Sequence, residues 1–564
     1  MTRTPFALLA LVLLLAMGIR LYGLEGIGVG GNDTILYYTL AESWARGDLV
    51  YRIGDSIEVF RPVLLAFNAL CLLALGHEDH AIKLANCLLD GANILLVAAL
   101  AWQVSRRTTV ALASAATYAF LPLAIWSSRQ ELPHTLSTTL VLLSCLLACR
   151  AALAGGDRPV SGTLALSGLA LMAATLVHEE LVLLALPMAL VFLLGRRVAV
   201  ASRKRSVWAA LAAFGVFPLL GVALVLVHQG ERVGDVLQPA GVDPWSAVAH
   251  YPERATRLLW NGVVGASSSL FALACGLALL GYRWAPRDGR ARDLRDRFAV
   301  GMCLGVPAVF LALYALFFET VFPRALLPLM PLLIVAVFSS VDRCLAGRPQ
   351  RLASRVGALL VVVFSVSSLA SYSAFKVGNR RFGTEWAAPD WPTARRLQAG
   401  YGEFLVDARY VPSYATHWRG IYDALGHRID REHRLLVTPS TVIYSAGRRA
   451  LQTEVYLGDN AIYRLDHFDE PLERLVRERN IKFVLFTLGQ GRPPPSRQRP
   501  YRYDGEWGAP RPVDLAASYG LPRYSVQGEF RQLAEALRAM GARPITPFPP
   551  GSFEAAVARV WQLP

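Results

Sequence analysis

The stretch GGNDTILYYTLAESWARGDLVYR, residues 30–52, decides how the rest of the chain is interpreted. It follows the first apolar segment, but it is too polar to cross a bilayer. Asn32 or Asp33 is a suitable N-cap for a helix that runs to about Arg46, and Gly47 is a typical C-terminal stop. The pattern therefore predicts a short helix rather than a plain loop.

Helical spacing places Tyr37, Leu40 and Trp44 on one face of this segment. An apolar face with aromatic anchors is typical of a helix that lies at a membrane surface. Asp33 is read as a capping residue or as a functional one, and the two readings are compatible because a carboxylate at a helix start is held rigidly.

The composition indicates that a large part of the chain lies in lipid. Of the 564 residues, 54% are hydrophobic and only 18% are charged, with a mean hydropathy of +0.37; soluble domains carry about 25% charged residues. The net charge of +15 would suggest nucleic acid in a soluble protein. In a membrane protein, the positions of the charges along the chain are considered first, because they indicate the orientation in the membrane. We expect membrane lipids around this chain and no nucleic-acid partner.

Eleven apolar runs approach the roughly 20 residues that a membrane span needs. They cover about 5–24, 81–103, 109–127, 132–150, 160–177, 181–195, 206–228, 262–282, 298–318, 325–342 and 354–375. The apolar run 62–76 is shorter and is predicted as a helix in or dipping into the interface.

Basic residues set the predicted topology, because cytoplasmic loops are rich in Lys and Arg. They follow every even-numbered span, as at Arg106 and Arg107, and counting 62–76 as a span would break this pattern. The N-terminus is therefore predicted to be cytoplasmic. The segment 25–80 and everything after residue 376 are predicted to face outward.

Unusual polar residues collect on the outward-facing segments. They are Asp33, Glu58, Arg61, Glu78, Arg129, Glu131, His134, His178, Glu179, Glu180, Glu319 and Arg324. Capping by Glu131, a solvated helix end at 178–180 and snorkelling arginines are the ordinary explanations. Ionisable groups at several helix mouths also often mark a site. Three adjacent residues cannot all point at one metal ion, so we assign no metal ligands.

The composition becomes that of a soluble protein from about residue 380. HRLLVTPSTVIYSAGRR, residues 433–449, contains a strand, and DEPLERLVRERNIKFVLFTLG, residues 469–489, a helix and then a strand. GEFRQLAEALRAMGARPI, residues 528–545, is a helix closed by Gly541. This alternation predicts a small α/β domain. We divide the chain into a transmembrane domain, 1–378, and an outer domain, 379–564.

The order of short motifs resembles the GT-C class of membrane glycosyltransferases. The likeness is greatest to the branch with the protein O-mannosyltransferases and the lipid A aminoarabinose transferases. It rests on NDTILYYTLAESWARGD (32–48), FRPVLLAFNALCLLALG (60–76), SRR (105–107), RQELP (129–133) and RALLPLMP (324–331). Many relatives have two adjacent carboxylates at the first motif, whereas Asp33 is followed here by Thr34. A divalent metal is therefore a doubtful cofactor.

The resemblance implies a mainly α, polytopic membrane enzyme of the bacterial inner membrane with a periplasmic C-terminal domain. It implies transfer from a polyprenyl-phosphate-sugar donor to a lipid, glycan or protein hydroxyl, with inversion. The candidate catalytic residues are Asp33, as base, and Glu131. Candidates for the donor phosphate are Arg61, Arg324 and Lys83, and those for substrate and sugar are Tyr37, Tyr38, Arg129, His134, His178 and Glu179.

Two other classes fit parts of the pattern. A transporter or flippase would also have many spans, but such proteins often show repeated halves and ionisable residues near mid-membrane. Here the halves do not match, and we expect the spans to lack such charges. A membrane-anchored receptor that binds through its outer domain would leave the helix at residues 30–52 without a role.

Overall fold

The structure is a computed structural model, and it is mainly helical. It describes residues 3–22, 24, 32–51, 60–77, 80–153, 161–195, 208–229, 251–252, 255, 258, 267–284, 301–317, 323–345, 348–382, 424–430, 432–439, 461–463, 472–487, 534–545, 547 and 558–564. Glu58, Glu78, Glu319 and the basic loops at 196–205 and 287–297 lie outside this set.

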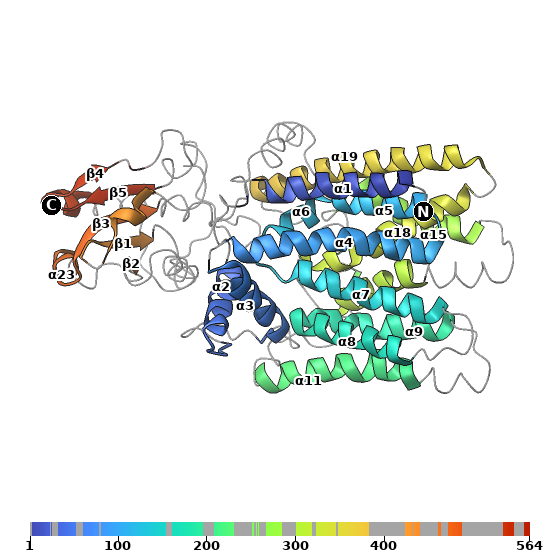
Figure 1. Cartoon of the computed structure of the whole chain (residues 1–564). Helices are drawn as coiled ribbons and strands as arrows, with labels where there is room; N and C mark the ends of the chain where they lie inside the picture. The colour runs from blue at the N-terminus through green and yellow to red at the C-terminus, as the bar shows by residue number, and fades with distance from the viewer. Residues whose placement is uncertain are drawn as a thin grey trace.

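Helices make up the described part of residues 3–382, and the longest of them run side by side (Figure 1). In the first half these are α1 (Arg3–Leu21), α2 (Asn32–Ala45), α3 (Pro62–Leu75), α4 (Ala81–Ser105), α5 (Thr108–Ala119), α6 (Pro122–Ser128), α7 (His134–Leu153), α8 (Ser161–Val177), η2 (Glu179–Leu184) and α9 (Ala185–Gly195). The second half contains η3 (Ala212–Val216), α11 (Phe217–Gln229), α15 (Ser269–Trp284), η5 (Gly301–Gly305), α17 (Val306–Phe317), η6 (Pro323–Leu329), α18 (Met330–Cys344) and α19 (Gln350–Phe382).

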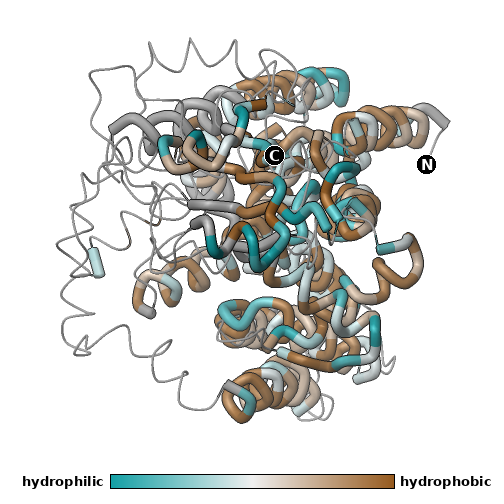
Figure 2. The backbone as a smooth tube through the Cα atoms, turned by 90° about the vertical axis from the view of Figure 1, so that its left-hand side faces the viewer, coloured by the Kyte–Doolittle hydropathy of each residue, from teal (hydrophilic) through white to brown (hydrophobic). Residues whose placement is uncertain are grey.

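The helices confirm a multi-pass membrane protein. In the described part of the chain, 5 helices are long and apolar enough to cross a membrane, or up to 6 with α5 and α6 as one span bent by 59°. Shorter apolar helices cover Pro5–Leu21, Pro62–Leu75, Ser161–Val177 and Gly301–Leu316. Figure 2 shows the helices end-on. Most of the residues along them are hydrophobic, and hydrophilic residues occur in short stretches.

The turn after α2 confirms the helix stop predicted at Gly47. Gly47 has a φ of 99°, which a residue without a Cβ adopts at little cost. The N–H of Asp48 donates to the Ser43 carbonyl, and that of Gly47 donates to the Trp44 carbonyl. This pair of bonds is the Schellman motif that ends many helices.

The packing of α2 differs from the prediction of a single apolar face. Tyr37, Tyr38 and Leu40 are all buried, and so is Ala41. Tyr38 and Ala41 face a cluster shared with α3 and α4, whereas Tyr37 packs against residues of α3, α7 and α8. α2 is therefore packed between other helices, and among its described side chains Glu42 and its ion-pair partner Arg46 lie toward the open side.

Close contacts between helices hold the interior. Ser144 of α7 and Ser167 of α8 each donate to the other's carbonyl oxygen, at 2.8 and 2.7 Å. A Cβ on Gly168 would lie 2.3 Å from the carbonyl oxygen of Ala213, so only glycine fits where α8 meets η3. Small residues and interhelical hydrogen bonds are the usual means by which membrane helices pack.

The C-terminal part forms a five-stranded sheet with the order β2-β1-β3-β5-β4. The elements are β1 (Arg434–Pro439), β2 (Ala461–Tyr463), α23 (Leu472–Glu478), β3 (Ile481–Thr487), β4 (Arg543–Ile545) and β5 (Ala558–Gln562). β1 pairs in parallel with β2 and β3, whereas β5 is antiparallel to β3 and β4. The predicted helix before Gly541 is present at 534–539, and Gly541 has a φ of 77°. The α/β prediction for this part is confirmed.

Candidate active site

The candidate site lies where α4 and α7 begin and α8 ends. α2 and α3 lie side by side at this end of the bundle (Figure 1). η6 packs against α6 and α7. At the opposite end, Arg107 before α5 forms an ion pair of 3.6 Å with Asp342 of α18. Arg61, Glu131 and Glu179 are thus separated from this basic end by the length of the helices.

Lys83 and Glu131 form a fully buried ion pair. The Lys83 Nζ lies 2.9 Å from the Glu131 Oε1, and both side chains are 0% exposed. Lys83 stands in the first turn of α4, and Glu131 in the non-helical segment 129–133 between α6 and α7. Two buried charges are tolerated only when they are paired and hydrogen-bonded. The ion pair fixes the position of the Glu131 carboxylate relative to α4.

Arg61 joins α2, α3 and η2. It is the residue before α3, where Pro62 sets the first turn. Its guanidinium donates to the Tyr37 hydroxyl at 2.8 Å and to the Glu179 carboxylate at 3.2 Å. Burial raises the pKa of the Glu179 carboxyl, but the charges of Arg61 and His178 outweigh burial and lower this pKa to about 2. Glu179 is therefore an anion at any physiological pH.

Two histidines lie next to this group. The rings of His134, at the start of α7, and His178, before η2, have centroids 5.4 Å apart. The Nδ1 of His178 lies 3.6 Å from a Glu180 carboxylate oxygen. The sequence-predicted residues Arg61, Tyr37, His134, His178 and Glu179 are therefore brought together from four segments of the chain.

Two other residues that were predicted to contact substrate donate hydrogen bonds to backbone carbonyl groups. Arg129 is buried and donates to the Tyr22 carbonyl at 2.9 Å. The Tyr38 hydroxyl donates to the His77 carbonyl at 3.0 Å. These bonds connect the segments around the site.

The backbones of Asp33 and Arg324 belong to α2 and η6. Their side chains lie outside the described part of the structure. The predicted roles of both residues stay predictions. In the described ranges no three His, Cys, Asp or Glu side chains form a group that would hold a metal ion.

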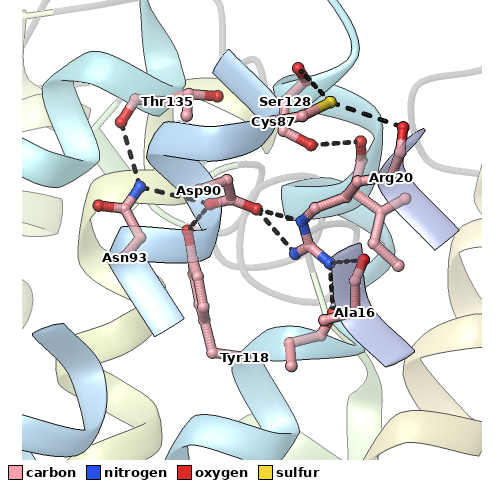
Figure 3. Close-up of polar contacts among 10 residues, drawn as sticks. Ala16, Arg20, Cys87, Asp90, Asn93, Tyr118, Ser128 and Thr135 are labelled. Atoms are coloured by element: carbon pink, nitrogen blue, oxygen red, sulfur yellow. Dashed lines mark hydrogen bonds and ion pairs between the residues drawn. The ribbon is translucent and has the colours of Figure 1, made fainter. Parts of the chain in front are cut away.

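A buried polar network inside the bundle was missed from the sequence (Figure 3). The Arg20 Nε and Nη2 each lie 2.7 Å from the Asp90 Oδ2, and neither residue is exposed to solvent. The hydroxyl of Tyr118 donates to the other Asp90 oxygen at 2.6 Å, and Asn93 donates to the same oxygen at 3.3 Å. Arg20 also donates to the carbonyl of Ala119, the last residue of α5.

The expectation that the spans lack ionisable residues was wrong. Arg20 and Asp90 lie within two of the predicted spans, and they form an ion pair that links α1 to α4. The sequence signal was present, because a charge inside an apolar run is costly and usually marks a partner or a site. The pair is a neutral unit that ties helices together, whereas a transporter would be expected to line a polar path.

Comparisons with known proteins agree with this architecture. Residues 61–221 match the model of a family described as dolichyl-phosphate-mannose-protein mannosyltransferase. No curated protein sequence matches the chain. The matched residues agree with the resemblance to GT-C membrane glycosyltransferases that the order of motifs predicted.

Among solved structures, the fold is similar to that of ArnT from Cupriavidus metallidurans bound to undecaprenyl phosphate. The TM-score is 0.51 with 14% sequence identity, over 86% of this chain and 94% of that one. The apo form of the Archaeoglobus fulgidus oligosaccharyltransferase has a TM-score of 0.48 with 12% identity, over 86% of this chain and 69% of that one. The ArnT comparison shows a shared fold that extends over most of both chains.

Proposed function

We propose that the chain is an inverting glycosyltransferase that moves a sugar from a polyprenyl-phosphate-linked donor to an acceptor hydroxyl. The acceptor is a lipid, glycan or protein of the cell envelope. The observation that carries the proposal is the group of ionised side chains at one end of an apolar bundle: Lys83 with Glu131, and Arg61 with Glu179. The similarity to ArnT, whose structure contains undecaprenyl phosphate, supports this class of donor.

The reaction needs a base, a leaving group and positive charge. The acceptor oxygen attacks the anomeric carbon from the face opposite the phosphate, and its proton passes to Asp33. The bond between that carbon and the phosphate oxygen breaks, and the lipid phosphate leaves as an anion. A single displacement of this kind inverts the anomeric carbon.

Cations at the site stabilise the charge that develops on the leaving phosphate. Arg61 and Arg324 fill this role, with Lys83 as a further candidate. The Tyr37 hydroxyl and the Glu179 carboxylate orient the planar Arg61 group, and a fixed planar fork suits two phosphate oxygens. Glu131, held by Lys83, orients hydroxyl groups of the sugar or of the acceptor.

We place this site at the outer face of the bacterial inner membrane. The exposed residues Arg106 and Arg107 and the basic start of α19 lie at the opposite end of the bundle from Arg61. Basic residues favour the cytoplasmic side. The C-terminal domain then lies in the periplasm.

The test measures donor consumption. Wild-type protein in nanodiscs is incubated with labelled polyprenyl-phosphate-linked sugars, one donor at a time, and an envelope lipid or glycan extract. We expect free polyprenyl phosphate and labelled acceptor to form in equal amounts. General-base catalysis contributes about 10²–10⁴-fold, so Asp33→Asn should lose roughly this factor.

Asp48→Asn is the matched control, because Asp48 is an exposed carboxylate at the other end of the same segment. It should transfer sugar at the wild-type rate. Asn is as good an N-cap as Asp, so the Asp33 variant should stay folded. Normal turnover by Asp33→Asn would make Asp33 a cap only. Absence of donor consumption by the wild type, with unchanged envelope lipids and glycans in a deletion strain, would overturn the function.

A further inference from the structure

One face of α4 carries a row of buried polar residues. Lys83, Asn86, Cys87, Asp90 and Asn93 are all at most 1% exposed. Their spacing of three and four residues places them on one side of the helix. An apolar residue at each position would cost less in lipid, so the row needs a structural or functional reason.

The row contacts the segment that carries Glu131. Lys83 pairs with the Glu131 side chain, Asn86 donates to the Gln130 carbonyl at 2.8 Å, and Asn93 donates to the Thr135 carbonyl at 3.3 Å. The Cys87 thiol lies 3.4 Å from the Ser128 carbonyl. Four residues of the segment 128–135 are thus held by one face of α4.

These contacts supply hydrogen-bond partners for backbone carbonyl groups. Residues 129–133 are not helical. The Pro133 carbonyl accepts from the N–H of Ser137 in α7, whereas the Gln130 carbonyl needs a partner from outside the segment. Such backbone is tolerated at membrane depth only where protein groups satisfy it. The Asn86 amide is the partner of the carbonyl in the peptide bond between Gln130 and Glu131.

The Arg20–Asp90 pair holds the row in place. Asn93 bridges the Asp90 carboxylate and the Thr135 carbonyl, and Arg20 binds the Ala119 carbonyl just before the bend into α6 (Figure 3). Arg129 is tied to the end of α1 through the Tyr22 carbonyl. The segment is therefore fixed from two sides.

We propose that Asn86 is a positioning residue for sugar transfer. By holding the Gln130 carbonyl it fixes the peptide bond before Glu131, so the Glu131 carboxylate stays aligned with Lys83 and with the substrate. This inference rests on the proposed role of Glu131 in the transfer reaction. The other polar residues of the α4 row form the frame on which this alignment depends.

The test is a double-mutant cycle with Asn86→Leu and Glu131→Gln. A misplacement of about 1 Å can lower a rate by about 10²-fold, so we expect Asn86→Leu to lower kcat about 10- to 100-fold and leave the donor KM nearly unchanged. If Asn86 acts through Glu131, then Asn86→Leu should cause no further loss in the Glu131→Gln background. Asn86→Gln keeps the amide donor on a longer stem and should regain part of the rate.

Asn68→Leu is the matched control. Asn68 is a fully buried asparagine on the neighbouring helix α3, and neither its amide nitrogen nor its oxygen has a hydrogen-bond partner in the described structure. We expect its kcat to equal that of the wild type. Ser144→Ala, which removes bonds between α7 and α8, should lower the melting temperature without changing kcat at permissive temperature.

Hydrogen exchange separates this inference from the proposed function. The backbone N–H groups of residues 129–132, 134 and 135 should exchange faster in Asn86→Leu than in the wild type. Their exchange should be unchanged in Asn68→Leu. This readout tests whether Asn86 holds the segment even if the wild type consumes no donor, a result that would overturn the proposed function and, with it, the role of Asn86 in transfer. Equal loss of kcat in both backgrounds, or unchanged exchange, would overturn the positioning role. Asn86→Ala replaces Asn86→Leu if the latter does not fold.

Discussion

Breaking the Arg20–Asp90 pair should destabilise the bundle far more than removing both charges. Arg20→Met keeps an unbranched apolar stem but removes the guanidinium and with it both 2.7 Å contacts to Asp90. The charge-assisted hydrogen bond from the Arg20 Nε contributes roughly 1.5–3 kcal/mol, and breaking a buried ion pair costs about 3–5 kcal/mol. We therefore expect Arg20→Met and Asp90→Leu each to lower the free energy of unfolding by about 3–5 kcal/mol.

The double variant leaves no uncompensated charge. Its remaining cost comes from the hydroxyl of Tyr118, the amide of Asn93 and the carbonyl of Ala119, which lose partners. The loss should therefore be well below the sum of the two single losses. Unfolding of purified protein at increasing SDS fraction, followed by tryptophan fluorescence, measures all three variants. Losses that add to within about 0.5 kcal/mol would refute a direct interaction.

Four further outcomes follow from the structure. Arg61→Ala should raise the donor KM or lower turnover by the equivalent of roughly 1.5–3 kcal/mol, and Arg61→Lys should rescue it poorly because an ammonium lacks the planar fork; wild-type kinetics would exclude a donor contact. Reporter fusions should be cytoplasmic after Arg205 and periplasmic after Arg380, and the opposite pattern would invert the topology. The lowered pKa of Glu179 means that its stabilising effect is complete above its ordinary pKa and is lost as pH falls through about 2; Glu179→Gln should thus be less stable than wild type at pH 7, with the difference vanishing in strong acid. Asn68→Leu should leave thermal stability unchanged or raise it, because a buried amide without partners is costly, and a lower melting temperature would reveal a partner for Asn68.

Local signals explain why much of the fold was predictable. A stop such as Gly47 depends on a positive φ over a few residues, and the strand at 481–487 depends on a run of β-branched and aromatic residues. Burial of α2 on two sides was not predictable, because it depends on which helices pack around Tyr37 and Tyr38. β5 was also missed, since its place beside β3 is a pairing between segments far apart in the sequence.

The same limit applies to the site. The helix-mouth residues Arg61 and Glu179 were identified from the sequence, but their ion pair joins residues 118 positions apart. Lys83 was considered only as a phosphate ligand, because nothing local shows that it faces Glu131. Asp90 was overlooked because one carboxylate in a long apolar run does not change its appearance as a span. Three-dimensional proximity decides these partners.

The ion pair between α1 and α4 also constrains how the protein is made. A carboxylate at the centre of a helix costs about 2.5–3.5 kcal/mol when a single segment leaves the translocon for lipid. Arg20 precedes Asp90 by 70 residues, so α1 is synthesised before α4. During synthesis the cation is thus available before the anion that it neutralises. Helix α1 must then remain beside the lateral gate until α4 emerges, and the first helix of the chain acts as an insertion partner for a later one.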